Sequence, residues 1–257
     1  MAARTTFRSG NPALNEKTFT GLAPTAERMT IQGTVNKTFI LLLLILVSAT
    51  WIWNRFDALE PTQAARSAAE IYPWMLGGMI GGFVMVLITV FKKEWSMVTT
   101  PIYALLEGLF LGGISAIFEA QYPGIVIQAI ALTFGTMFCL LVAYTSGLIK
   151  VTQNFRLGIA AATGGIFLIY LVSFGLSFFG INIPYIHESG LIGIGFSLFV
   201  VVIAALNLVL DFDFIENGAE RGAPKYMEWY GAFGLMVTLV WLYIEILRLL
   251  SKLRSRN

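Results

Sequence analysis

Seven long apolar stretches, separated by short polar ones, dominate the chain. A membrane-spanning helix needs about 20 mainly apolar residues, and each stretch is close to that length. None of them alternates polar and apolar positions as the strands of an outer-membrane barrel do. The pattern therefore predicts an all-α membrane protein, a bundle of seven transmembrane helices. The predicted spans are residues 36–54, 72–91, 100–118, 125–148, 157–179, 190–212 and 229–250.

The polar residues before the first span predict a flexible cytoplasmic tail over residues 1–35, followed by one transmembrane domain over residues 36–253. A secretory signal would place its apolar core near the start of the chain, so we expect none. Lysine and arginine favour the cytoplasmic side of a membrane. They concentrate in the tail and in every second loop, which predicts a cytoplasmic N-terminus and an external C-terminus. The C-terminal end conflicts with this orientation because it is also basic, with Arg248, Lys252, Arg254 and Arg256.

Composition agrees with residence in a membrane. Of 257 residues, 57% are hydrophobic and only 12% are charged, whereas a soluble domain has about 25% charged residues. The single cysteine, Cys139, excludes a disulfide framework. The net charge of +2 is too small to indicate nucleic acid as a partner. The lipid bilayer is therefore the expected partner.

Motifs for enzymatic chemistry are absent from the sequence. It has no His-Glu-x-x-His helix for zinc and no Gly-x-x-x-x-Gly-Lys-Ser/Thr loop for phosphate. The one histidine, His187, stands beside Glu188, and two residues do not make a metal site. We therefore expect no enzymatic activity and no cofactor.

Small residues four positions apart predict close packing of some of the helices, because they let two backbones approach. The simplest interpretation is compaction of the bundle. The pairs are Gly77 and Gly81, Gly78 and Gly82, Gly108 and Gly112, and Ala160 and Gly164.

Ionisable groups inside a bilayer are costly, so each one within a predicted span is a candidate functional residue. Glu107 lies near the middle of the third span, and no basic residue of that span lies within one turn of it. Its carboxyl group must be protonated, pair with another helix or face water. A role in an ion pathway and a structural role as a hydrogen-bonded neutral acid both fit this position.

The sixth span ends in a polar stripe. Asn207 and Asp211 are four residues apart and share one helical face, and Asp213 follows them. Acids near the C-terminus of a helix oppose its dipole, so a partner or a function should offset their cost. These three residues are therefore candidates for a functional role. A solvated helix end is the competing interpretation.

Glu245 lies late in the seventh span. Arg248, three residues further on, can neutralise it on the same helical face. A structural ion pair at the membrane edge and a role in an ion pathway are both open for this residue.

Several segments resemble the Bax inhibitor/YccA-like membrane proteins, in particular a bacterial branch with a longer N-terminal tail. They are Asn11–Leu14, Met29–Lys37, Glu107–Gly112, Ala204–Ile215 and Trp241–Leu250. The resemblance covers nearly the whole chain. It implies seven helices with the last one central, and a protein of the bacterial inner membrane.

The resemblance also implies a pH-sensitive calcium leak channel, gated by an acid that ends the sixth span and an acid in the seventh. Asp211 matches the first position, so the resemblance makes it a candidate for weak calcium binding and, with Asn207 and Asp213, for an ion pathway or a pH sensor. The second is Glu245 or Thr238, depending on which terminal motif is aligned. Residues that face each other across an antiparallel hairpin lie at equal depth, which favours Thr238. The second acid would then be missing, with Glu107 or Glu228 as a substitute.

Two functional hypotheses follow. The first is a cation-leaking bundle with intramembrane acids as its gate and calcium as the transported ion. The alternative is a membrane interaction protein that conducts nothing and regulates a partner such as a membrane protease. The polar tail over residues 1–37 favours the alternative, because a conduction pathway does not need it.

Overall fold

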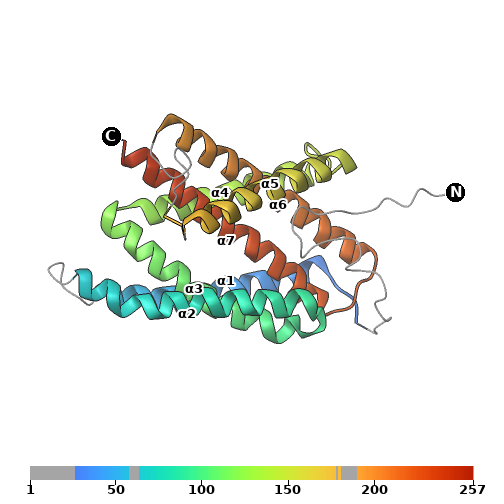
Figure 1. Cartoon of the computed structure of the whole chain (residues 1–257). Helices are drawn as coiled ribbons and strands as arrows, with labels where there is room; N and C mark the ends of the chain where they lie inside the picture. The colour runs from blue at the N-terminus through green and yellow to red at the C-terminus, as the bar shows by residue number, and fades with distance from the viewer. Residues whose placement is uncertain (1–26, 58–63, 178, 181–189, 257) are drawn as a thin grey trace. The chain divides into compact units, whose positions relative to one another are not determined.

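The structure is a computed structural model that describes residues 27–57, 64–177, 179–180 and 190–256. The predictions for the tail before residue 27 and for the loop of His187 lie outside these residues. Seven helices in the described part are long and apolar enough to cross a membrane, which confirms the predicted all-α fold (Figure 1). They are α1 (Ile31–Asp57), α2 (Ala64–Phe91), α3 (Ser96–Gln121), α4 (Ile125–Thr145), α5 (Gln153–Ser177), α6 (Leu191–Glu220) and α7 (Met227–Arg254), with a short 3₁₀ helix over Lys93–Trp95.

The helix ends differ from the predicted spans where local backbone chemistry decides them. The first helix begins at Ile31 rather than at residue 36, because Thr30 caps it: the Gly33 N–H donates to Thr30 Oγ1 at 2.9 Å. The fourth ends at Thr145 rather than at residue 148, and Gly147 follows with φ 75°, a conformation that favours glycine.

The described residues fall into two compact units. Unit 1 contains residues 127–216 and 237–256, and unit 2 contains residues 27–126 and 217–236. The helix α7 contributes its first turns to unit 2 and the remainder to unit 1. It is also the most buried of the seven, with 61% of its most apolar window buried, against 50% for α6.

In unit 2, α1 and α2 both pack against α3 (Figure 1). Two glycines of α3 allow the α1 backbone to come close. A Cβ at Gly108 would lie 2.5 Å from the carbonyl oxygen of Ile45, and one at Gly112 would lie 2.5 Å from that of Ala49. Since no real Cβ tolerates such distances, this pair of glycines determines the α1–α3 spacing.

The other small-residue pairs divide between contacts and open space. A Cβ at Gly78 of α2 would lie 2.5 Å from the carbonyl oxygen of Leu106 on α3. By contrast, a Cβ at Gly77 or Gly164 would meet no described atom within 4 Å. The predicted close packing therefore holds for α3 with its neighbours and is wrong for the pair at Ala160 and Gly164.

The core of unit 1 forms where α5, α6 and α7 meet. Ile166 of α5 packs with Val200 and Ile203 of α6, and Trp241 of α7 covers this cluster. The opposite side of α6 is apolar and open. Its half-exposed residues are Leu198, Phe199 and Val202. That side suits lipid, and the buried side carries the polar residues described next.

Candidate functional site

Asn207 and Asp211 lie on the buried face of α6, and Asp211 is 0% exposed. The amide of Asn207 donates to Thr163 Oγ1 on α5 at 2.9 Å and to the Ile203 carbonyl at 2.8 Å. Its Oδ1 atom is also buried, and none of the described residues donates to it. The interior of unit 1 therefore holds a carboxyl group and an amide oxygen on one helical face.

Asp213 and Glu216 point to other partners than Asp211 does. The guanidinium of Arg156 on α5 pairs with Asp213 at 2.8 Å, and the Tyr144 hydroxyl of α4 donates to Glu216. Successive residues of a helix point about 100° apart, so Asp213 lies on nearly the opposite side from Asp211. These three acids of α6 therefore face different surroundings: Asp213 pairs with α5, Glu216 binds α4, and Asp211 lies on the buried face.

Glu245 on α7 is 2% exposed and belongs to a three-residue cluster. Arg248 donates to Glu245 Oε1 at 2.8 Å and to the Tyr170 hydroxyl of α5 at 2.8 Å. The Tyr170 hydroxyl lies 3.1 Å from the same carboxylate oxygen. The ion pair between Glu245 and Arg248, one of the two interpretations of Glu245, is therefore present in the structure.

Lys252 joins the last turns of α7 to the start of α6. Its side chain is 5% exposed. The ammonium donates to the Gly193 carbonyl at 3.1 Å and to Ser197 Oγ at 2.8 Å. A basic residue that the sequence assigned to a C-terminal tail therefore lies inside unit 1.

The Lys252 contact shows that α6 and α7 are antiparallel in unit 1. Near the start of α6, Ser197 meets Lys252 at the end of α7. Further along α6, Ile203 lies in the cluster that Trp241 covers. Advancing along α6 therefore means moving back along α7.

Counting residues from the Lys252 contact places Thr238 near the depth of Asp211. Seven residues advance a helix by about 10.5 Å. The count starts from Lys252 on α7 and Ser197 on α6, which are in contact. One seven-residue step, backward on α7 and forward on α6, reaches Glu245 and Ala204, and a second step reaches Thr238 and Asp211. Thr238 is 3% exposed. On this count a hydroxyl group, and not Glu245, is the polar group of α7 nearest to the depth of the buried carboxyl group.

Glu107 lies in unit 2 on α3 and is half-buried. Its carboxylate faces α2, because a Cβ built at Gly82 would lie 3.2 Å from Glu107 Oε2. The structure therefore assigns Glu107 to the α2–α3 contact of unit 2.

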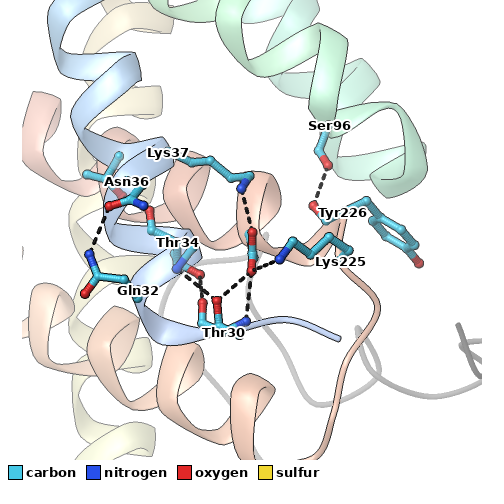
Figure 2. Close-up of polar contacts among 11 residues, drawn as sticks. Thr30, Gln32, Thr34, Asn36, Lys37, Ser96, Lys225 and Tyr226 are labelled. Carbon is cyan, nitrogen blue, oxygen red and sulfur yellow. Dashed lines mark hydrogen bonds and ion pairs between the residues drawn. The ribbon is translucent and has the colours of Figure 1, made fainter. Parts of the chain in front are cut away.

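A second polar centre lies at the start of α7 in unit 2. Glu228 is the one acid of this centre that the sequence suggested as a candidate. Glu228 is 0% exposed. Its carboxylate accepts from Lys37 at 2.5 Å, from Lys225 at 3.2 Å, and from the Thr30 N–H and hydroxyl at 3.0 and 2.9 Å. Figure 2 shows the side chains of Thr30, Lys37 and Lys225 converging on this carboxylate. Ser96 of α3 adds a bond of 3.0 Å to the Tyr226 carbonyl.

The Glu228 contacts complete the N-terminal cap of α1 from another helix. In a capping box, an acid three residues after the cap residue accepts the N–H of that cap residue. Here Gly33 occupies that position, and Glu228 accepts the Thr30 N–H instead. A Cβ at Gly33 would lie 2.1 Å from Glu228 Oε1. Glycine is therefore the residue that leaves room for the carboxylate.

The backbone before α1 follows the turn between α6 and α7. Arg28 and Pro224 form an antiparallel bridge. The Met29 N–H donates to the Ala223 carbonyl at 2.6 Å, and the Lys225 N–H donates to that of Glu27 at 3.2 Å. The base of the N-terminal tail is thereby fixed to the α6–α7 turn.

Neither centre has the ligand set of a strong metal site. No group of three or more His, Cys, Asp or Glu side chains able to hold a metal ion occurs in the part of the chain that the structure describes. Calcium prefers six to eight oxygen ligands. Any cation held at Asp211 would therefore depend on hydroxyl, amide and water oxygens as well.

Comparison with known proteins identifies the family. The sequence profile of the family described as Bax inhibitor 1 like matches residues 11–255, nearly the whole chain. The chain belongs to the Bax inhibitor 1-like family. No curated protein matches it significantly. The family resemblance expected from the sequence is therefore confirmed.

Two of the four basic residues at the C-terminal end of this Bax inhibitor 1-like protein have partners within the transmembrane domain. Arg248 is paired with Glu245, and Lys252 is buried on α6. Orientation follows the basic residues of loops and tails, so these two residues carry less weight than their number suggests. The conflict with an external C-terminus is smaller than the sequence implied, and the orientation stays a prediction.

Proposed function

We propose that this protein is a pH-sensitive cation leak channel of the bacterial inner membrane, with calcium as the transported ion. The pathway runs along the buried face between α6 and α7 in unit 1. The N-terminus lies in the cytoplasm, and the protein catalyses no reaction and carries no resident cofactor.

The buried carboxyl group of Asp211 carries this proposal. A carboxyl group inside a membrane span is costly and by default indicates function. Asp211 shares its helical face with Asn207, and the count from the Lys252 contact places the buried Thr238 near its depth. A carboxylate with hydroxyl and amide oxygens offers calcium only some of the ligands that it prefers. Such weak binding suits a leak, because a permeating ion must leave as readily as it enters.

Protonation supplies the gate. A cation and a proton compete for the same carboxylate oxygens, so binding of one excludes the other. Membership of the Bax inhibitor 1-like family supports the proposal, because the resemblance to that family implies a gating acid at the end of the sixth span, where Asp211 lies. With Thr238 as the nearest polar group of α7 on that count, the proposed gate of this chain has one acid rather than a shared pair.

The Asp211→Asn variant tests the proposal. Purified protein is reconstituted in liposomes that contain a calcium-sensitive dye, and influx is followed between about pH 5 and pH 8. We expect pH-dependent influx for the wild type and a loss of about tenfold for the variant, as for a site that loses about 1.4 kcal/mol of cation binding. Glu220→Gln is the matched control, because Glu220 is an exposed acid at the end of the same helix. Absence of influx at every pH for all three proteins would contradict the proposal.

Regulation of a membrane protein partner is the second candidate, and the anchored base of the tail favours it. Residues 27–30 are fixed on the α6–α7 turn, so whatever binds the tail acts next to the start of α7. Deleting residues 2–26 keeps this anchor. On this hypothesis the deletion removes a cross-linked membrane partner and leaves calcium influx unchanged. An identical set of cross-linked partners in the intact and shortened proteins would count against it.

A further inference from the structure

Buried polar side chains of α6 and α7 repeat at seven-residue intervals in unit 1. On α6, Ser197 and Asp211 lie on one stripe, two seven-residue steps apart. On α7, Thr238, Glu245 and Lys252 repeat at the same interval. All five are less than one-tenth exposed. We call these five side chains the α6–α7 seam, which spans the distance from the proposed cation site at Asp211 to Lys252 in the last turns of α7.

The contacts of Lys252 are those that a small cation would make. Its ammonium lies on a backbone carbonyl oxygen, that of Gly193, and on the hydroxyl of Ser197. Carbonyl and hydroxyl oxygens are also the groups that replace the hydration shell of an ion in a channel. The ammonium is covalently tethered, so it occupies these oxygens without passing through.

We propose that Lys252 is the electrostatic plug of the pathway: its ammonium occupies the cation position at one end of the α6–α7 seam. This proposal rests on the proposed function and adds to it the residue that limits the leak, Lys252. A fixed positive charge at the end of a low-dielectric pathway repels an entering cation, and such fields change ion entry by about 10- to 1,000-fold.

A purely structural role predicts a different response. A lysine that only joins α7 to α6 stabilises the two helices, and its loss would lower stability without a dependence on charge. A plug acts through its charge, so restoring a positive charge by another chemical group must restore the block. This difference determines the experiment.

The test replaces the lysine and then restores its charge. In a Cys139→Ala background, Lys252→Cys is reconstituted in liposomes with the calcium dye. We expect influx to rise at least about tenfold over that of the same background with Lys252 intact. Aminoethyl methanethiosulfonate then forms a mixed disulfide with Cys and releases a sulfinate, which attaches an ammonium of similar reach. Influx should return to the starting level, whereas the uncharged methyl reagent should leave it high.

Controls separate the plug from the pathway itself. Arg256→Cys, an exposed basic position at the same end, should change nothing in the same treatment. Adding Asp211→Asn to Lys252→Cys should remove the extra influx. If Asp211→Asn lowers influx but Lys252→Cys leaves it unchanged, or if the reagent does not label Cys at this position, the plug is wrong and the pathway stands. If no protein conducts at all, the proposed function fails and the plug with it.

Discussion

Replacing Gly108 and Gly112 together by alanine should destabilise the protein more than any other conservative change in unit 2. A Cβ at Gly108 would lie 2.0 Å from Ser48 Oγ and 2.5 Å from the Ile45 carbonyl oxygen, and one at Gly112 would lie 2.3 Å from Ile52. Overpacking a well-packed contact costs about 1–3 kcal/mol per site. The obstacle here includes backbone, which cannot rotate away, so we expect a loss of at least about 3 kcal/mol for the pair.

The measurement is the free energy of unfolding in mixed micelles, obtained from tryptophan fluorescence during titration with a denaturing detergent. Gly77→Ala with Gly164→Ala is the matched control, because both positions lie in helices and a Cβ there would meet nothing within 4 Å. Alanine is favoured over glycine within a helix by about 0.5–1 kcal/mol. The control pair should therefore be unchanged or more stable. Equal losses for both pairs would mean that the α1–α3 contact does not limit stability.

Glu228→Ala should lower the free energy of unfolding by about as much, for an electrostatic reason. Removing one partner of a buried ion pair costs about 3–5 kcal/mol, because the remaining charge stays buried without compensation. Here the variant leaves the Lys37 ammonium and the Thr30 N–H without their acceptor. Detergent titration measures the loss, and Glu228→Gln, which keeps the shape and one acceptor oxygen, should lose less.

A double variant tests whether Glu228 acts as the cap of α1. Gly33→Glu places an acid at the position of a conventional capping box, but in the wild type it collides with the Glu228 carboxylate, 2.1 Å from the site of its Cβ. Once Glu228→Ala has vacated that space, the new acid can accept the Thr30 N–H. Each single variant should therefore be less stable than the double variant. Additive losses would contradict the capping role, since independent sites add.

Sequence patterns predicted the helices well because span formation is local. About 20 apolar residues suffice to define a span, and no knowledge of neighbouring helices is needed. The differences occur at the ends, where single residues decide: Thr30 starts α1 early, and Gly147 follows the early end of α4. Both signals are visible in the sequence but are weaker than the apolar runs.

The site was only partly predictable, because its contacts join distant residues. Asp211 and Asn207 could be selected, since they are polar groups on one face of an apolar helix. The role of Glu228 could not be deduced, because its partner Thr30 lies 198 positions away. The one local hint was that Gly33, rather than an acid, stands three residues after the cap residue Thr30.

Lys252 shows the opposite difficulty. A basic residue near the end of a chain is typical of a solvated tail, and the positive-inside rule uses it as such. Its burial against Gly193 and Ser197 depends on the antiparallel register of α6 and α7. That register comes from packing, which apolar periodicity alone does not specify.

The shared cap of α1 also determines the order in which the protein can be completed. A ribosome adds about 5–20 residues per second, so the 198 positions between Thr30 and Glu228 take about 10–40 s. Throughout that interval the first turn of α1 lacks its acceptor, and the Lys37 ammonium lacks its counter-charge. A chain that stalls before α7 thus carries a recognisable defect at its beginning, and the first helix to be synthesised is among the last to be finished.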